Sequence, residues 1–376
     1  MDERIQPERL VSAEGGLRLV LTAQLKPVGG ADRFQPAGFP EIGHVIYDAP
    51  RGDDEVEPVC IIDSAASMAN HLERVCVRSD YDPTPVDELS SLAHLRCVTD
   101  GAGTGEAAPE EDGREVVVTS LTEGHRIAST YFLAGKRIDG EGPGERTFEE
   151  ELREACGIQD LGTRTHPLPE AWWTTFRALF RYDPNSLVHG VLLPRWQVKI
   201  PRVLTAHHEA FGAQRVDRSG VKFDRLGKTV SGQPIFAVDD ETARTIRATF
   251  VLDLALLRSF GRDDLGLGDA EKRALAALAL WKVGRLLAQP FRYRSGCDLE
   301  CVDIDAQLDG QDVDVSADDL AGLPVGTFLD GAVGAVAERD GMRPGVVDIY
   351  WPRDELYRAP KEVAEATEDE ELDDEE

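Results

Sequence analysis

The segment from Asp63 to Cys76 joins an apolar stripe to an unusual set of polar groups. Its apolar residues recur at intervals of three and four, the spacing of one face of a helix. The opposite face carries hydroxyl, amide, imidazole and guanidinium groups, whereas a solvated face usually carries glutamate and lysine. These groups hydrogen-bond phosphate and ribose oxygens, and the amino end of a helix attracts anions. We predict an anion-binding face, although a merely exposed face has the same pattern. Its residues are Ser64, Ser67, Asn70, His71 and Arg74.

A loop upstream of this helix places a cation next to an aromatic ring. Arg33, Phe34 and Gln35 follow the flexible pair Gly29 and Gly30. Single-stranded RNA is held by charged grooves and by rings on which bases stack, so these side chains are candidate contacts. The alternative is that Phe34 anchors a local core. A lone histidine is usually structural, so we rank three further candidates lower. These are His125, Arg126 and His189.

The chain is strongly acidic, with a formal net charge of −29, yet some of its basic residues cluster. Between Pro194 and Gly232 there are eight basic and three acidic residues, a local charge of +5. Phosphate contacts dominate the affinity of proteins for nucleic acids, so a positive stretch on an acidic background suits a phosphate track. Pairing of these cations with carboxylates elsewhere in the chain is the alternative. The candidates from this track and from the basic segment 291–296 are Arg202, Arg218, Lys222, Arg225 and Arg294.

Signals for enzymatic chemistry are weak. The sequence contains no Gly-x-Ser-x-Gly nucleophile motif, no His-Glu-x-x-His metal motif and no P-loop. Its glycine-rich stretch, residues 100–115, is acidic and precedes no helix, so it does not suit a nucleotide phosphate. Four carboxylates of one segment could hold Mg²⁺ for phosphodiester cleavage, but they are also typical of the solvent-exposed face of a strand. They are Asp298, Glu300, Asp303 and Asp305. We predict no catalytic residue, no bound metal and no cofactor.

Periodicity places these residues on a mixture of strands and helices. Seven segments have the pattern of strands: 17–25, 116–120, 129–133, 187–193, 197–204, 248–254 and 346–351. Four segments have the pattern of helices: 63–76, 147–156, 168–180 and 269–288. We expect Asp269 to cap the last helix, which is apolar nearly all round and should lie in the core. Strands interspersed with a few helices indicate an α+β sheet with helices on one face.

The organisation along the chain is that of one domain. No internal repeat is visible, so residues 1–360 are assigned to a single domain with insertions, among them the loop 100–115. Residues 214–238 mix basic, aromatic and glycine residues and are expected to form a projecting β-hairpin. Residues 361–376 hold ten acidic residues and one lysine, so we expect a disordered acidic tail. Neither a secretory signal nor a membrane-spanning apolar run is found, and a cytoplasmic location is expected.

Several blocks of the sequence resemble one known family, in the same order. The first is the glycine- and proline-rich stretch from Leu25 to Asp48, which follows a strand and leads to the helix 63–76. Further blocks lie at 123–129, 181–190, 200–206, 218–225, 250–258 and 294–300. On these residues the chain resembles the backbone subunit of type I-G (formerly I-U) CRISPR surveillance complexes. That subunit is a RAMP-superfamily protein, the Cas-seven-class member of a Cascade assembly.

The resemblance implies a fold, a function and partners. The fold is an RRM-like (ferredoxin-like) RAMP core with insertions and a β-hairpin thumb, for which residues 214–238 are the candidate. The function is that of a non-catalytic subunit that binds the backbone of guide RNA (crRNA) and oligomerises along it, leaving target recognition to base pairing. The partners are guide RNA, target DNA through base pairing, further copies of the chain in head-to-tail contact, and the other type I-G subunits in antiviral defence. No membrane is involved.

Two other functions remain open. A carboxylate- and metal-dependent ribonuclease of the same superfamily would require the four carboxylates of residues 298–305 to converge near the basic track. An acidic scaffold or nucleic-acid mimic would use the net charge of −29, and the tail 361–376, to engage a basic partner.

Overall fold

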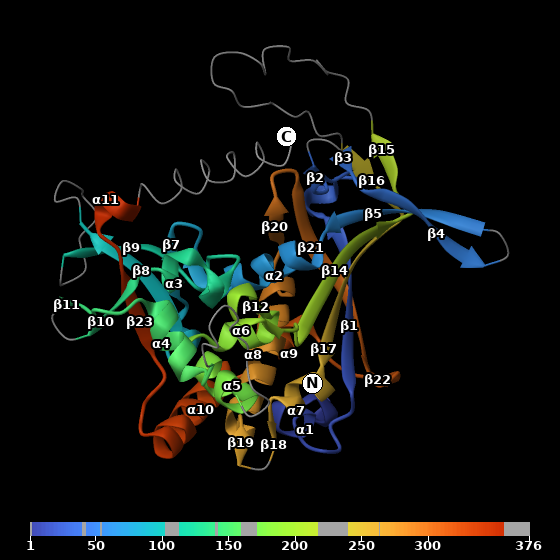
Figure 1. Ribbon diagram of the computed structural model, residues 1–376. Coiled ribbons are helices and arrows are strands. Elements are labelled where there is room, and N and C mark those ends of the chain that lie inside the picture. Colours follow the sequence, from blue (N-terminus) through green and yellow to red (C-terminus); the bar gives the residue numbers. More distant parts are fainter. Residues whose placement is uncertain are drawn as a thin grey trace, which may run out of the picture.

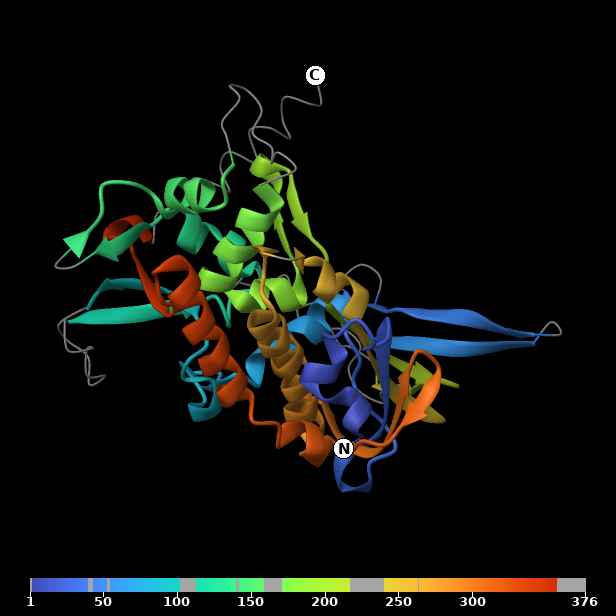
Figure 2. The same ribbon diagram turned by 90° about the horizontal axis from the view of Figure 1, so that it is seen from below.

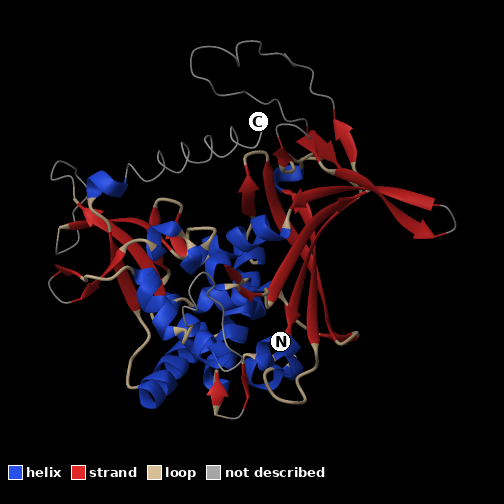
Figure 3. Cartoon of the chain, viewed as in Figure 1, coloured by secondary structure: helices blue, strands red, loops and turns tan. Residues whose placement is uncertain are grey.

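The computed structural model describes residues 2–39, 43–52, 55–101, 113–139, 142–158, 171–216, 240–262 and 264–356. Its elements form three layers (Figure 1): a large curled antiparallel sheet, a central group of helices, and a smaller sheet beyond them. Figure 3 shows the helices lying between the two sheets. The class is therefore mixed α+β, as expected from the sequence.

Eight of the described strands form the main sheet, in the order β20-β21-β1-β17-β14-β5-β4, with β22 beside β21. Neighbouring strands are antiparallel throughout. β4 and β5 form a long hairpin that projects from the body (Figure 2). The strands are β1 (Arg18–Pro27), β4 (Ile46–Gly52), β5 (Glu55–Asp63), β14 (Leu204–Phe211), β17 (Thr245–Asp253), β20 (Phe291–Arg294), β21 (Cys297–Leu308) and β22 (Gln311–Val313).

The central strands and two helices alternate in a regular way. Along the chain the order is β1, helix α2 (Ala65–Arg74), β14, β17, helix α8 (Asp269–Leu287) and β21. In space the strands run β21-β1-β17-β14, so β17 separates the parallel pair β1 and β14. Both helices lie on the same side of the sheet and contact each other (Figure 1).

The smaller sheet has the order β11-β10-β23-β8-β9, in which only β23 and β8 pair in parallel among the described residues. Short pairs β2–β3, β6–β7, β12–β13, β15–β16 and β18–β19 complete the described strands. These strands are β2 (Gly38–Phe39), β3 (Gly43–His44), β6 (Val77–Ser79), β7 (Asp82–Pro85), β8 (His94–Asp100), β9 (Arg114–Thr119), β10 (Lys136–Asp139), β11 (Gly142–Pro143), β12 (Val191–Leu193), β13 (Val198–Ile200), β15 (Gln214–Val216), β16 (Asp240–Thr242), β18 (Gly261–Arg262), β19 (Leu265–Gly266) and β23 (Val346–Tyr350).

Helix α8 forms the centre of the core. Its alanines and leucines are buried nearly all round, because it contacts α1, α2, α6, α7, α9 and α10. The expected cap at Asp269 is wrong by one residue. Gly268 is the N-cap, and its N–H donates to the carboxylate of Glu271 at 2.8 Å. The remaining described helices are α1 (Pro7–Leu10), α3 (Thr130–Leu133), α4 (Phe148–Ala155), α5 (Ala171–Tyr182), α6 (Pro184–His189), α7 (Leu254–Ser259), α9 (Ala317–Ala321), α10 (Val325–Asp340), α11 (Arg353–Leu356) and the 3₁₀ turn η4 (Arg126–Ala128).

Side chains alternate between the two faces of the main sheet. On β17, Ile246, Ala248, Phe250 and Leu252 are buried in the core, and the residues between them lie on the outer face. β14 follows the same rule, so its outer face carries residues 205, 207, 209 and 211. One face of the sheet is thus packed by helices and the other is polar.

Most of the expected elements are present, and three of the expected strands differ from the structure. Segments 17–25, 116–120, 248–254 and 346–351 correspond to β1, β9, β17 and β23, and the four expected helices correspond to α2, α4, α5 and α8. Segment 129–133 is helix α3, because the hydroxyl of Ser129 accepts from Tyr131 N and starts a helix. Segment 187–193 is half helix and half strand: residues 187–189 end helix α6, which begins at Pro184, and after Gly190 residues 191–193 form β12. Segment 197–204 contains only the short β13.

Several expectations fall outside the described residues. β15 and β16 pair and would form the base of the expected hairpin 214–238, but residues 217–239 are not described. The same holds for most of the loop 100–115 and for the tail 361–376.

One described segment, Ala317–Asp340, has the length and mean hydropathy of a membrane span, with 39% of its apolar window buried. Residues 322–324 divide it into α9 and α10, which both pack on α8. Leu329, Ala332 and Val336 face the core. The segment therefore has the packing of two helices that cover a core.

Candidate nucleic-acid interface

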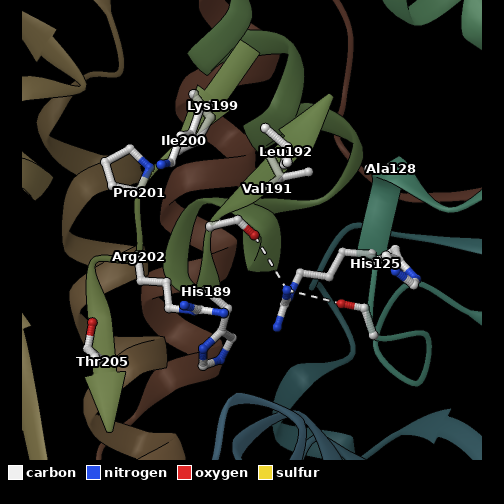
Figure 4. Close-up of a pocket in the computed structure, with 13 residues that line it drawn as sticks. His125, Ala128, His189, Val191, Leu192, Lys199, Ile200, Pro201, Arg202 and Thr205 are labelled. Carbon is white, nitrogen blue, oxygen red and sulfur yellow. Dashed lines mark hydrogen bonds between the residues drawn. The ribbon is translucent and has the colours of Figure 1, made fainter. Parts of the chain in front are cut away.

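A cleft of about 550 Å³ lies between η4, the turn from α6 to β12, and the connection from β13 to β14 (Figure 4). It brings together four residues that the sequence singled out, although they are up to 77 positions apart. These are His125, Arg126, His189 and Arg202. The other lining residues are Gly124, Ala128, Gly190, Val191, Leu192, Lys199, Ile200, Pro201 and Thr205.

The rim of the cleft is cationic. Lys199 and Arg202 are exposed, and neither has an ion-pair partner within the part of the chain that the structure describes. The ring of His125 is 83% exposed and lies 2.8 Å from a carboxylate oxygen of Glu123. Thr205 adds a hydroxyl group to the same wall. These are the groups that hold phosphate and ribose oxygens.

The floor of the cleft rests on a buried ion pair. Arg126 donates from Nε and Nη2 to the two carboxylate oxygens of Glu73, at 2.6 and 2.9 Å. Its Nη1 donates to the carbonyls of Gly124 and Gly190, at 3.2 and 3.5 Å (Figure 4). Arg126 has φ of +56°, a conformation that costs energy for a non-glycine residue and that the ion pair holds in place.

Gly190 is required by the shape of this floor. Its φ is +79°, and a Cβ at this position would lie 2.8 Å from the carbonyl oxygen of Ile200. Only glycine allows the chain to turn here while β13 approaches so closely.

Below the floor, a buried network links helices α2, α6 and α8. Asn185 donates to Glu73 at 2.5 Å, and the ammonium of Lys282 donates to Asn185 Oδ1 and to His189 Nε2, the latter at 3.0 Å. Burial and the charge of Lys282 lower the pKa of His189 well below its usual value, so the ring is neutral. Because Nε2 accepts, the ring proton lies on Nδ1, which has no partner among the described residues. His189 Nδ1 is therefore a donor that is buried behind the wall of the cleft, since the side chain is only 1% exposed.

The polar face of α2 is only partly free. Asn70 is exposed and its Oδ1 lies 3.8 Å from the position of a Cβ on Gly124, so it adjoins the cleft. Ser64 is exposed, and its hydroxyl caps α2 by accepting from Ser67 N at 3.2 Å. Arg74 pairs with Asp80 at 2.5 Å.

The other polar residues of α2 surround a buried carboxylate, Asp63. Ser67 donates to it at 2.6 Å, His71 Nε2 lies at 3.5 Å, and Arg294 forms a close ion pair with it. Burial raises the pKa of Asp63, but the hydrogen bonds from His208 and His71 and the charge of Arg294 outweigh it, so the net shift is downward. Ser67, His71 and Arg294 thus hold the end of β5 against α2 and β20, and the structure does not bring them to the cleft.

The loop around Arg33 also lies away from the cleft. Phe34 is 1% exposed in the core, the alternative left open by the sequence, so neither face of its ring is accessible for stacking. Its backbone pairs with Glu241. Arg33 pairs with Asp240 at 3.3 Å, and Gln35 N donates to the carbonyl of Gly296. Arg218, Lys222 and Arg225 lie outside the described residues.

The carboxylates of β21 do not converge on the basic cleft. Asp298 pairs with Arg292 at 2.8 Å and Glu300 with Lys26 at 3.1 Å. None of the four lines the cleft, and no group of three or more metal-binding side chains occurs within the described ranges.

Sequence reasoning missed the residues that support the cleft. Glu73, Asn185 and Lys282 lie on three different helices, and Lys199 belonged to the basic track without being selected. Lys282, which follows the apolar run 274–281 of this helix, was the one available signal, because a buried ammonium requires partners.

A family model described as CRISPR-associated protein GSU0053 matches residues 19–215, which is more than half of the chain. The match begins in β1 and ends in β15, so it includes α2, η4, α6 and every residue that lines the cleft. No curated protein matches the chain.

Proposed function

The chain belongs to the family of CRISPR-associated proteins described as GSU0053, and from this premise we propose that it is a non-catalytic, RNA-binding backbone subunit of a type I-G CRISPR effector complex. Family membership supports a role in CRISPR defence. The observation that carries the RNA-binding part is the cleft, where His125, Arg126, His189, Lys199 and Arg202 gather on a chain of net charge −29.

The groups around the cleft favour recognition of a nucleic-acid backbone. Cationic and hydroxyl groups contact phosphate and sugar without reading sequence, whereas base recognition needs complementary edges at defined positions. A subunit of this kind holds guide RNA and leaves its bases free to pair with target DNA.

The strand order supports an RRM-like (ferredoxin-like) core of the RAMP type. A strand–helix–strand–strand–helix–strand chain with the spatial order β21-β1-β17-β14 is the arrangement of that fold. The β4–β5 hairpin, the smaller sheet and the β15–β16 pair are then insertions into it. The thumb proposed for residues 214–238 would project from β15 and β16.

Assembly follows from the proposed role. Copies of the chain are proposed to associate head to tail along guide RNA, since a heterologous interface that does not close generates a helical filament. The other type I-G subunits and target DNA complete the partners, and the proposed location is the cytoplasm.

The experiment is RNA binding by the purified chain, followed by fluorescence anisotropy over a range of KCl concentrations. Combined Lys199→Ala and Arg202→Ala substitutions should weaken binding about tenfold or more and make the slope of log K against log salt shallower by about 1.4. Arg343→Ala, an exposed arginine far along the chain, is the matched control and should bind as the wild type does. An RNA-free monomer that binds no guide RNA at low salt would refute the proposal.

A further inference from the structure

A second positively charged pocket lies on the outer face of the main sheet, at the base of the β4–β5 hairpin. Its volume is about 260 Å³. It is enclosed by side chains from β4, β5, β14 and β17 and from the turn before β17. They are Arg51, Glu57, Phe211, Arg244, Thr245 and Arg247.

The charges in this pocket are not balanced. Arg51 Nε donates to one oxygen of Glu57 at 2.7 Å, and Arg244 donates to the other oxygen. Arg247 forms no ion pair with a described carboxylate, and its Nε is buried without a described partner. Glu209, opposite Arg247 in the sheet, already accepts a tyrosine hydroxyl at 3.0 Å. The residues that line the pocket therefore carry three guanidinium groups and one carboxylate, which pairs with two of them.

The guanidinium groups are held in place by packing. The centre of the Arg247 guanidinium lies 4.2 Å from the ring centroid of Phe211, and that of Arg51 lies 5.5 Å from it. Stacking on a ring fixes the guanidinium plane and leaves its N–H edges for an oxygen ligand. Gly212, with φ of +66°, lets Arg244 approach, because a Cβ there would lie 3.1 Å from the Cβ of Arg244.

One strand joins this pocket to the cleft. Thr205 lines the cleft and Phe211 lines the pocket, and both lie on the outer face of β14, six residues or about 20 Å apart. Between them on this face lie the exposed His207, with Thr249 beside it on β17, and Glu209, which is opposite Arg247. At the other edge of this face, β21 carries exposed carboxylates such as Asp305, which repel an anion from that side.

We propose that single-stranded nucleic acid bound in the cleft continues along the outer face of β14 and places a phosphate in the pocket of Arg51, Arg244 and Arg247. The inference rests on the proposed function and extends it to a second contact point. A phosphate accepts hydrogen bonds from two N–H groups of one guanidinium, which is the geometry that arginine favours over lysine. The phosphate also supplies negative charge to a pocket in which Glu57 alone does not balance the three arginines.

The test compares two labelled RNAs, one of about six nucleotides that the cleft alone can hold and one of about twenty that reaches both sites. Combined Arg244→Ala and Arg247→Ala substitutions should weaken binding of the long RNA about tenfold, with a salt slope shallower by about 1.4, and should leave the short RNA unaffected. Glu57→Gln should act in the opposite direction and tighten binding of the long RNA about threefold. Arg247→Lys, which keeps the charge but not the planar stack, should lie between the wild type and the double variant.

Arg343→Ala is the control for loss of one exposed arginine, and thermal unfolding of each variant checks that it folds. If the double variant and Glu57→Gln both bind the long RNA as the control does, the pocket is not a phosphate site, while binding by the wild type keeps the proposed function. If they change self-association in light scattering and not RNA binding, the pocket is a protein interface and the inference is wrong. If the wild type binds neither RNA, both proposals are wrong.

Discussion

Asp183, at the amino end of α6, offers a sharp test of the buried network beneath the cleft. Its side chain is fully buried, the hydroxyl of Ser186 donates to Oδ2 at 2.7 Å, and Oδ1 has no partner among the described residues. Burial raises the pKa of Asp183 to about 7, against the lowering effect of the Ser186 hydrogen bond. The folded protein therefore binds this proton more tightly than the unfolded chain, in which an aspartate has a pKa of about 3.9.

The substitution Asp183→Asn keeps the shape of the side chain and removes its ionisation. In the wild type the stability contributed by the bound proton is fully present below about pH 4 and is lost as the pH rises to 7 and above. A difference of about three pKa units corresponds to about 4 kcal/mol in total, of which about 3 kcal/mol is lost between pH 5 and pH 9. The stability of the variant relative to wild type should therefore rise by about 3 kcal/mol over that range.

The assay is urea unfolding followed by tryptophan fluorescence at pH 5, 7 and 9. The compared quantity is the difference in unfolding free energy between the variant and wild type, and its change with pH. A structural cost of the asparagine that does not depend on pH cancels in that change. The other titrating groups also cancel, because both proteins share them. Asp48→Asn, an exposed position on β4, is the matched control and should show no change with pH relative to wild type. If the difference in unfolding free energy between Asp183→Asn and wild type also stays constant from pH 5 to pH 9, burial does not raise the pKa of Asp183 as argued.

Three further substitutions test other parts of the site by thermal or urea unfolding. Gly190→Ala should cost about 2–4 kcal/mol, because the residue has φ of +79° and a Cβ would collide with the Ile200 carbonyl; a cost below 1 kcal/mol would contradict this. Arg126→Ala should cost about 3–5 kcal/mol, since it leaves the carboxylate of Glu73 buried without its cation, and stability equal to wild type would show that the pair is not needed. Ser64→Ala should cost only about 1 kcal/mol, the value of one helix cap, and a much larger loss would assign Ser64 another role.

The elements that could be predicted from the sequence are those with a clear period. β1 and β17 alternate strictly, and α2 repeats its apolar residues every three or four positions, so each was placed to within a few residues. Helix α3 was missed because one serine hydroxyl begins it and its four residues hold no full period. The last three residues of α6 were assigned to the strand that contains β12, because α6 is buried on every side and its sequence shows no helical period that would separate the two.

The candidate site could be predicted only in part. His125, His189 and Arg202 were chosen from the sequence, and the fold brings them to one cleft. The roles of His71 and Arg294 could not be foreseen, because they depend on Asp63, whose burial is decided by the packing of α2 on β14. A sequence shows that a polar group is present, but whether it meets solvent or another buried group depends on contacts between distant segments.

The support of the cleft by α2, η4, α6 and α8 has a consequence for its dynamics. Because Lys282 and Glu73 tie its floor to α8, the helix at the centre of the core, the floor cannot open without breaking the core. Backbone amides at Arg126 and Gly190 should therefore exchange with deuterium only through global unfolding, at the rate of the amides within α8, and not through the local fluctuations typical of binding loops. The floor is therefore ordered before a ligand binds. Little of the binding free energy would be spent on ordering it.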